Sequence, residues 1–506
     1  MTGEGPGWGR PAGGRLSLAS LSRLDATMRP PVDPRALSVG VVHLGLGAFH
    51  RAHQAVYTEG AMAATGQTGW GVCGVTQRSR AVVDALAPQD GLYSVLERQD
   101  GAARVSVVAS VRQALFALED PDGLLDRLSQ PAVRVITLTV TEKGYRHDPS
   151  TGRLRGDDPE VAADAAGRPP TTVVGQLARG LQRRHRAGAG PVAVVSCDNL
   201  PGNGRLLSRL VADFLTMLPA AETAGLEDWM ADNVSFPCTM VDRMVPASTD
   251  QDRADAARML GLEDRAVVVA EPFSQWVVED RFVAARPAWE EAGVVITADV
   301  EPYEAMKLRL LNGSHSALAY LGSLAGHEHI SDAVRAAGFE AYVRALMDRD
   351  VTPTLQVPPG FDLEGYKRDL LDRFANRALR HRTAQVAMDG THKLPQRLIP
   401  VIRWQLAAGH EPRLACLAVA AWMRFVAAGR SDDGRPLPLD DPLAPLLRAR
   451  VRAAGTAREV ADALLGVEDV FGPDLGTAPG FRALVTGALA DLMRHGAAET
   501  VRAATS

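Results

Sequence analysis

The sequence has few cysteines and no long apolar run. Its 506 residues include four cysteines that lie far apart, and none of them belongs to a CxxC pair. This spacing argues against a zinc finger or a disulfide framework and is typical of reduced thiols in a cytoplasmic protein. No run of about 18 apolar residues occurs, so we expect no transmembrane helix.

A large excess of charge of one sign is also missing. Lys and Arg total 55 against 60 Asp and Glu, which gives a net charge of -5. This balance argues against a nucleic-acid or membrane-surface partner and leaves a small-molecule substrate, including an anionic one. Residues 1–38 are rich in Gly, Pro and Arg without a continuous apolar segment, so we expect a loose leader, not a secretory signal. Together these features indicate a cytoplasmic location.

What the sequence does contain is a set of apolar strands that alternate with helices. The runs at 39–44, 70–75, 133–140 and 191–196 are β-branched and nearly continuous, as in strands buried on both faces of a parallel sheet. This alternation predicts an α/β fold with a Rossmann-like, dinucleotide-binding domain over 39–298. Helical periodicity dominates afterwards, which predicts a mostly α-helical C-terminal domain over 299–506 that carries the substrate and catalytic residues.

The first strand runs directly into a glycine turn and then into a helix. Gly45 and Gly47 permit a tight turn and the close approach of a pyrophosphate, and the helix near Phe49 offers free backbone N–H groups. His50 stands where the third glycine of GxGxxG is usual. His50 and His53 are three residues apart, but without an HExxH pattern or a nearby cysteine we expect no metal site.

The end of the second strand bears on the choice of cofactor. An acidic residue there would select the ribose hydroxyls of NAD, but the sequence has Thr76 and Gln77. Arg78 and Arg80 follow, and either is able to accommodate the 2′-phosphate of NADP. The residues alone therefore leave the choice between NAD and NADP open.

The segment 303–322 carries an amine, an amide and an imidazole in an apolar context. At 100° per residue, Lys307, Asn312 and His315 fall within about 140° of a helix circumference. One interpretation is an interrupted helix with a snorkelling lysine and a packed histidine, since Asn-Gly alone indicates a turn. The other is oxidation of a secondary alcohol, with lysine as base and amides as oxyanion donors. Asn199 follows a predicted strand at the edge where parallel sheets bind ligands.

Seven ordered blocks cover nearly the whole chain beyond residue 38. They are VHLGLGAFHRAHQAVYTE (42–59), LTVTEKGY (138–145), SCDNLPGNG (196–204), FPCTMVDRMVPA (236–247), AEPFSQWVVED (270–280), YEAMKLRLLNGSHSALAYLG (303–322) and RHRTAQVAMDGTHKLPQRL (380–398). In these blocks the chain resembles the polyol-specific long-chain dehydrogenase/reductase family, which includes mannitol 2-dehydrogenase and fructuronate reductase.

The resemblance implies an NAD(P)-dependent, metal-independent oxidoreductase whose site lies between a Rossmann-like domain and a helical one. It implies Lys307 as general base, Asn199 and Asn312 as the oxyanion hole and His315 as a ligand of substrate hydroxyls. Asp242 and Lys393 would line the substrate pocket. The expected cofactor residues are Val42, His43, Leu44, Gly45, Leu46, Gly47, Ala48, Phe49, His50, Arg51, Thr76, Gln77, Thr141 and Glu142.

Within the family, the last block is most similar to the fructuronate reductase (D-mannonate oxidoreductase) branch. Gln385 stands where mannitol dehydrogenases typically carry an arginine, and Arg309 stands where they have a small residue. Arg380, Arg382 and Lys393 are cations able to receive a substrate carboxylate, although the two arginines are equally compatible with a solvated helix end.

We therefore expect NAD-dependent interconversion of D-mannonate and D-fructuronate, with Arg382, Gln385 and Lys393 in the substrate pocket. The alternatives are a mannitol, D-arabinitol or sorbitol dehydrogenase and, outside enzymes, an inactive NAD-binding regulator. The branch favours NAD over NADP, without excluding NADP.

Overall fold

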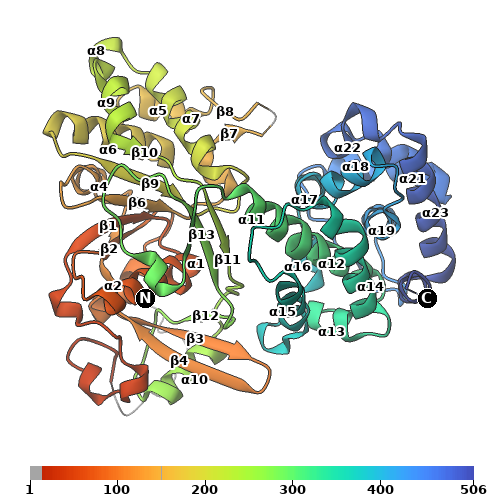
Figure 1. Cartoon of the computed structure of the whole chain (residues 1–506), viewed down its shortest axis with the longest axis horizontal. Coiled ribbons are helices and arrows are strands. Elements are labelled where there is room, and N and C mark those ends of the chain that lie inside the picture. The colour runs from red at the N-terminus through yellow and green to blue at the C-terminus, as the bar shows by residue number, and fades with distance from the viewer. Residues whose placement is uncertain (1–13, 150, 506) are drawn as a thin grey trace, which may run out of the picture. The chain divides into compact units, whose positions relative to one another are not determined.

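A six-stranded parallel sheet forms the centre of the first part of the chain in the computed structural model, which describes residues 14–149 and 151–505 (Figure 1). The strand order is β10-β9-β6-β1-β2-β5, and every neighbouring pair is parallel. The strands are β1 (Val39–Leu44), β2 (Gly71–Thr76), β5 (Val111–Phe116), β6 (Val135–Leu138), β9 (Val192–Ser196) and β10 (Val234–Ser235). The predicted parallel sheet is thus confirmed, and the first predicted strand has the bounds of β1.

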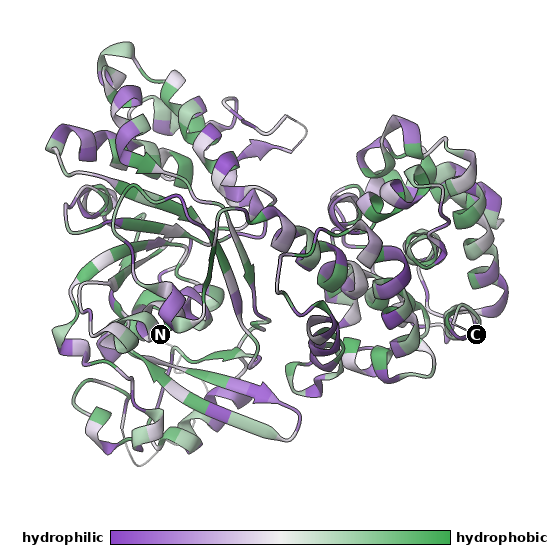
Figure 2. Ribbon diagram, viewed as in Figure 1, coloured by the Kyte–Doolittle hydropathy of each residue, from purple (hydrophilic) through white to green (hydrophobic). Residues whose placement is uncertain are grey.

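Successive side chains of the strands enter two different cores, so the sheet is buried on both faces. Val42 and Leu44 of β1 pack against α4 (Pro121–Leu128), α6 (Val173–Ala187) and α7 (Asn203–Thr216). Val41 enters the opposite core with α2 (Gln54–Thr65). The central strands are accordingly coloured mostly as hydrophobic in Figure 2. The other helices here are α1 (Ala48–Ala52), α3 (Ala81–Leu86), α5 (Pro159–Ala165), α8 (Ala220–Thr223), α9 (Leu226–Asn233) and α10 (Asp250–Leu260).

Three smaller sheets add strands that the sequence did not predict. One has the order β11-β13-β14, another β12-β3-β4, and the third is the β7-β8 pair. Their strands are β3 (Tyr93–Gln99), β4 (Ala102–Val108), β7 (His147–Asp148), β8 (Arg153–Leu154), β11 (Thr239–Asp242), β12 (Val268–Ala270), β13 (Gln275–Glu279) and β14 (Val295–Thr297).

Residues 14–38 differ from the loose leader that the sequence predicts. They form three short 3-10 helices, at Leu21–Arg23, Ala26–Met28 and Pro34–Ala36. Leu16 and Leu24 are buried in a core that also contains Val105 of β4. The leucines of this segment are separated by Ser, Ala and Arg, so they make no continuous apolar run, but each buried one still removes apolar surface from water.

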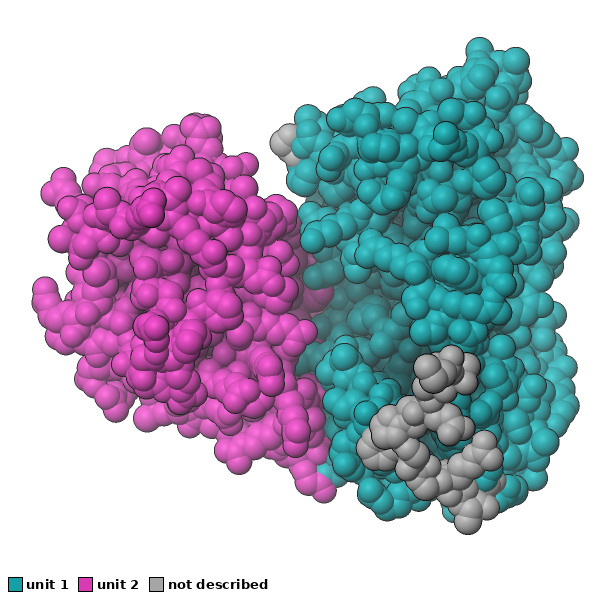
Figure 3. Space-filling view, turned by 180° about the vertical axis from the view of Figure 1, so that it is seen from behind, with its two compact units in different colours: residues 1–98, 102–301 teal, residues 99–101, 302–506 magenta. Residues whose placement is uncertain are grey.

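The chain divides into two compact units (Figure 3). The first holds residues 102–301 and those up to 98, and the second holds 99–101 and those from 302 onward. The second unit is mostly helical, as predicted. Its helical segments follow α11 (Glu301–Met306) and are a π-helix (Lys307–Gly313), α12 (Ser314–Leu324), α13 (Ile330–Arg335), α14 (Phe339–Ala345), a second π-helix (Leu346–Val351), α15 (Leu363–Ala375), α16 (Thr383–Ala387), α17 (Gly390–Arg397), α18 (Ile399–Ala407), α19 (Arg413–Ala428), α20 (Ala444–Val451), α21 (Ala457–Leu465), α22 (Glu468–Leu475), α23 (Pro479–His495) and α24 (Ala497–Ala503).

Helix α19 forms the centre of the second unit. It contacts α12, α20, α21 and α23, and its residues from Leu414 to Met423 are all buried. A helix that is apolar around its whole circumference is stable in water only when neighbouring helices enclose it. Among the described helices, none is both long enough and apolar enough to cross a membrane.

Candidate active site

Gly45 lets the end of β1 approach the loop after β6. Its φ is +102°, and a Cβ here would lie 2.1 Å from the Thr139 carbonyl oxygen. The Gly45 amide donates to the Val75 carbonyl oxygen at 2.8 Å, which ties the turn to the end of β2. Among the described atoms, a Cβ on Gly47 would meet only the Gly45 oxygen, 3.6 Å away. This turn has the close backbone and the open side that a pyrophosphate needs.

His43 and His50 form a buried pair beside the turn. Their rings stack with centroids 3.4 Å apart, and His43 Nδ1 lies 2.8 Å from Thr137 Oγ1. Burial lowers the pKa of His43 to about 3 and lowers the pKa of His50 well below its ordinary value. Both rings are therefore neutral at pH 7 in this structure, and the donors that the turn itself offers to a phosphate are backbone N–H groups.

The predicted helix after the turn is two helices. Helix α1 ends at Ala52, the backbone of His53 is not helical, and α2 begins at Gln54. Phe49 and His53 stack at 4.9 Å. The Arg51 guanidinium is buried and donates to the carbonyl oxygens of Gly47 and Ala266. Arg51 therefore joins α1 to the segment just before β12. Val42 and Leu44, with 0 % exposure, lie in the sheet beneath the turn.

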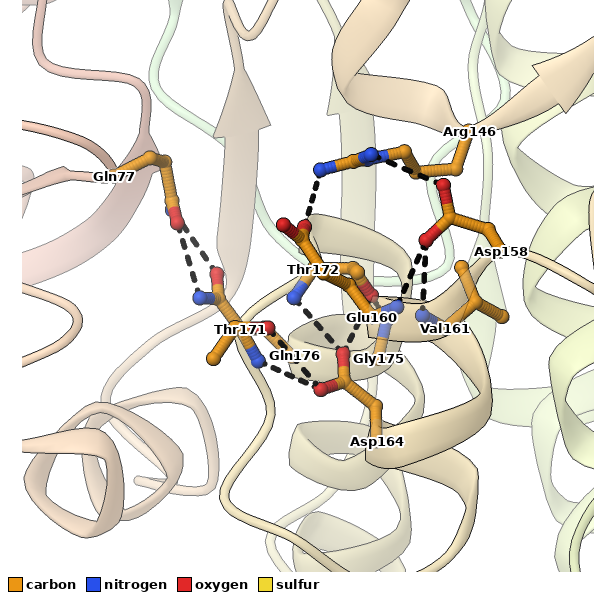
Figure 4. Close-up of polar contacts among 10 residues, drawn as sticks. All are labelled: Gln77, Arg146, Asp158, Glu160, Val161, Asp164, Thr171, Thr172, Gly175 and Gln176. Atoms are coloured by element: carbon orange, nitrogen blue, oxygen red, sulfur yellow. Dashed lines mark hydrogen bonds and ion pairs between the residues drawn. The ribbon is translucent and has the colours of Figure 1, made fainter.

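Residues at the end of β2 are held by other parts of the first unit. Gln77 and Gln176 of α6 exchange two side-chain hydrogen bonds of 3.0 Å (Figure 4). The hydroxyl of Thr76 donates to a backbone carbonyl of β5 at 3.3 Å. Arg80 is ion-paired with two carboxylates, whereas Arg78 is exposed. Of the two arginines considered for a 2′-phosphate, only Arg78 has its charge uncompensated by a described ion pair.

The start of α6 is fixed by hydrogen bonds that hold Gln176 in place. Asp164 accepts from the amides of Thr171 and Thr172, at 2.9 and 2.8 Å, and the Thr172 hydroxyl accepts from the Gly175 amide at 3.1 Å (Figure 4). Such N-terminal caps satisfy donors that the helix itself leaves unpaired. The Gln77 partner is thus rigidly placed.

The turn after β9 brings predicted substrate residues of the first unit into one region. Asn199 is exposed in this turn. Asn203 Nδ2 donates to the carbonyl oxygens of Asp198 at 2.9 Å and Thr239 at 3.0 Å, which joins the turn to β11. Asp242, at the end of β11, is buried. The same turn is joined to the loop of Thr141 and Glu142, because the Asp198 carboxylate accepts from the Thr141 amide at 2.8 Å.

In the second unit, the lysine and asparagine of the candidate motif lie on a π-helix. Lys307–Gly313 has i→i+5 hydrogen bonding, so the α-helical angles assumed from the sequence are wrong here. Residues five apart occupy successive turns of a π-helix, and Lys307 and Asn312 are five apart. Both are buried, and α-helical geometry resumes at Ser314 just before His315. The π-helix explains why the amine and the amide are five positions apart in the sequence.

His315 is surrounded by aromatic and basic side chains. Its ring lies 5.3 Å from Phe374 and 4.8 Å from His381, and its Nε2 is buried without a hydrogen bond to any described residue. Burial lowers the pKa of His315 well below its ordinary value, and His381, Arg397, Arg373 and Lys393 lower it further. His315 is therefore neutral, with a buried nitrogen able to meet a ligand hydroxyl.

Lys393 and Arg397 lie one turn apart on α17 and contribute positive charge near this histidine. The Lys393 ammonium donates to the Val386 carbonyl oxygen at 3.2 Å, and burial followed by repulsion from Arg397 lowers the pKa of Lys393 to about 8. Arg397 Nη1 donates to Ser316 Oγ at 2.9 Å and to the Asn312 carbonyl oxygen at 3.3 Å. We call Arg373, Lys393 and Arg397 the cationic cluster.

Sequence reasoning missed Arg373, His381 and Arg397 as site residues. Arg397 lies four residues after Lys393, a spacing that places both on one helix face and was available as a signal. In contrast, Arg382 is exposed and its side chain lies 3.6 Å from Glu328, and Gln385 is also exposed. Arg309 donates to the Thr354 carbonyl oxygen at 2.6 Å.

No group of three or more His, Cys, Asp or Glu side chains within 14–149 and 151–505 is arranged to hold a metal ion. Metal independence stays a prediction.

Comparison with known proteins decides the family. The model of the mannitol dehydrogenase Rossmann domain matches residues 39–291, and that of the mannitol dehydrogenase C-terminal domain matches residues 299–493. The chain belongs to the mannitol dehydrogenase family. This confirms the resemblance drawn from the seven sequence blocks.

Members of the mannitol dehydrogenase family with different names are similar to this chain. The oxidoreductase YdfI of Escherichia coli is 42% identical over 93% of this chain and 96% of its own length. The D-mannonate oxidoreductase of Escherichia coli is 40% identical over 94% and 97%. The structure of Pseudomonas fluorescens mannitol 2-dehydrogenase with NAD and D-mannitol has a TM-score of 0.85 and 38% identity over 97% of this chain and 99% of that one.

Proposed function

We propose that this protein interconverts D-mannonate and D-fructuronate with NAD as hydride acceptor. The general part of this statement follows from family membership: the protein is an NAD-dependent oxidoreductase that acts on the CH–OH group of a polyol or a sugar acid. The particular substrate is our inference from the residues of the second unit.

The cationic cluster is the observation that favours a sugar acid as the substrate. Arg373, Lys393 and Arg397 all act on His315; Arg373 is buried, and Lys393 and Arg397 are half-buried. Burying several positive charges together is unfavourable unless an anion offsets them. Asp389, Asp440 and Asp441 offset part of the charge on Lys393. A substrate carboxylate would supply a further anion with charge-assisted hydrogen bonds, which a neutral polyol cannot do.

The residues of the first unit fit a dinucleotide. The backbone of the turn at 45–47 would hold the pyrophosphate, and residues of the loop at 141–142 would lie against the rest of the cofactor. NAD supplies a hydride acceptor when it is bound. No charged histidine is needed, because His43 and His50 are neutral and help to shape the turn by packing.

In the second unit, Lys307 accepts the proton of the substrate hydroxyl at Nζ as the C–H bond gives up its hydride. Asn312 and Asn199 donate N–H groups to the developing alkoxide oxygen, which lowers the barrier by stabilising its charge. His315 positions a neighbouring hydroxyl through its buried Nε2. In the reverse direction, Lys307 returns the proton to the carbonyl oxygen.

A neutral polyol such as mannitol, D-arabinitol or sorbitol is the second candidate. The similarity to the Pseudomonas fluorescens mannitol 2-dehydrogenase along nearly the whole chain favours it. A neutral polyol has no carboxylate, so it would not bind the cationic cluster through an ion pair as a sugar acid would.

A substrate panel separates these candidates. Initial rates of NADH formation would be measured with D-mannonate, mannitol, D-arabinitol and sorbitol. We expect the highest kcat/KM for D-mannonate, and a higher value for any neutral polyol would overturn the sugar-acid proposal. Binding of NADH without turnover of any of the four would favour the inactive regulator.

A further inference from the structure

The loop after β6 contains the most unusual backbone of the described chain. Thr141 has φ 67° and ψ 161°, a region that is essentially reserved for glycine. The other described non-glycine residues with positive φ, namely Asp90, Arg146, Arg380 and Asp389, all have ψ between 30° and 42°. A β-branched residue keeps such a conformation only where its surroundings enforce it.

The carboxylate of Asp198 provides that enforcement. Its Oδ1 accepts from the Thr141 amide at 2.8 Å, and its Oδ2 accepts from the Val140 amide at 3.0 Å and the Tyr145 hydroxyl at 2.8 Å. Tyr145 Oη also lies 2.6 Å from Ser196 Oγ. Asp198 is buried, and both of its oxygens are engaged. Asp198, just after β9, thus accepts three hydrogen bonds from the segment that follows β6.

This loop forms one wall of the glycine turn. The Thr139 hydroxyl donates to the Gly45 carbonyl oxygen at 2.9 Å, and the Thr139 amide donates to Leu44 at the end of β1. The Thr139 carbonyl oxygen occupies the space where Gly45 lacks a Cβ. The backbone of residues 139–141 is therefore continuous with the turn proposed to hold the pyrophosphate.

Burial of the Asp198 carboxylate in its ionised form is unfavourable for folding. Burial raises the pKa of Asp198 above its ordinary value. A carboxyl whose pKa is higher in the folded chain than in the unfolded chain favours folding when protonated, and that contribution is lost as the pH rises. The ionised form that accepts three hydrogen bonds is thus kept at a cost to stability.

We propose that Asp198 is a positioning residue for the cofactor, which holds the strained Thr141 backbone against the glycine turn. The inference rests on the proposed function, because it takes the turn at 45–47 as the dinucleotide site. Asp198 acts through the loop, and the neighbouring Asn199 acts on the substrate.

Asp198→Asn tests the role of these hydrogen bonds with little change in the shape of the side chain. An amide has one oxygen, so it is unable to accept from the Val140 and Thr141 amides on both sides as the carboxylate does. Glu59→Gln is the matched control in the same unit. Glu59 is buried and accepts from the amides of Ala109 and Ser110, but through a single oxygen, Oε2, which a glutamine retains.

The measurement is NADH binding by fluorescence titration, together with the unfolding midpoint of each variant. We expect Asp198→Asn to weaken NADH binding by about tenfold or more, the effect of losing a hydrogen bond to a charged group. Tyr145→Phe, which removes one donor only, should weaken it by a smaller factor. Glu59→Gln should bind as the wild type does.

Wild-type NADH affinity in Asp198→Asn, or in Tyr145→Phe if Asp198→Asn does not fold, would overturn the inference and leave the proposed function standing. Equal weakening in Glu59→Gln would also overturn it, because any buried carboxylate of the unit would then have the same effect. If the wild type itself did not bind NADH, both the inference and the proposed function would fall.

Discussion

At the scale of single residues, Lys393 shows how burial makes a charge sensitive to pH. Its pKa is lowered to about 8, mainly by burial and then by Arg397, while Asp389, Asp440 and Asp441 act in the opposite direction. The ammonium is therefore charged below pH 8 and loses its proton as the pH rises through that value. A substrate carboxylate needs the charged form, whereas a neutral polyol needs it less.

We therefore expect the KM for D-mannonate to rise above about pH 8, and the KM for mannitol to change much less. Initial rates at several substrate concentrations give both KM values. The measurements run from about pH 6.5 to about 9.5, a range that spans the pKa of Lys393. Lys393→Met should show a high KM for D-mannonate at every pH. Equal pH dependence for the acid and the polyol would contradict the role given to Lys393.

Gln77 gives a prediction about cofactor choice. Its amide is paired with Gln176, and no acid stands at this strand end to repel a 2′-phosphate. We expect NAD to be preferred to NADP, but modestly. Gln77→Asp should sharpen the preference in kcat/KM, with Gln176→Glu as the control that places a new charge on the partner. A wild-type preference for NADP would refute the cofactor choice.

At the scale of elements, the π-helix at Lys307–Gly313 links spacing to chemistry. A turn of π-helix is closed by an i→i+5 hydrogen bond, so it contains one residue more than the corresponding α-helical turn. Such insertions are frequent at functional sites. Lys307 and Asn312 therefore lie on one helix face although they are five residues apart, one more than the i, i+4 spacing of an α-helix.

For Asn312→Ala we expect a folded protein whose kcat is lower by about two orders of magnitude, as on loss of one oxyanion donor. Leu308→Ala, on the same π-helix, should retain most of the turnover. The two variants are compared by circular dichroism and by initial rates of NADH formation. Full activity of Asn312→Ala would show that this amide is not needed for catalysis.

The elements also show what the sequence was able to predict. Strand β1 follows from an uninterrupted apolar run and a glycine turn, both local signals, and it has the predicted bounds. The π-helix does not follow, because a periodicity read at 100° per residue assumes the α-helical bond pattern. Strands β3 and β4 were missed although Asp100-Gly101 between them is a hairpin signal.

Among site residues, Lys307, Asn312 and His315 are near in sequence and were found together. Arg373, His381 and Arg397 act on His315 only because α15, α17 and the segment between them fold against α12, and single-sequence patterns do not encode that packing. Asp198 was inside a recognised block, but its role depends on the contact with the loop after β6.

At the scale of the whole molecule, the account needs no metal. In the proposed mechanism an amine takes the proton and amides stabilise the alkoxide, so no Lewis acid is required. We expect dialysis against EDTA to leave kcat/KM within about twofold of the untreated enzyme. Inactivation by the chelator with rescue by zinc would show that His50, His53 or other histidines bind a metal.

In the proposed mechanism the first unit binds the hydride acceptor and the second carries the base. Lys307→Ala tests this division most directly. The account predicts that kcat for the best substrate of the panel falls by roughly two to four orders of magnitude, the range for removing a general base. NADH binding should stay at the wild-type value, because the glycine turn and the Asp198 loop are unchanged. Turnover near the wild-type rate in Lys307→Ala would contradict the account.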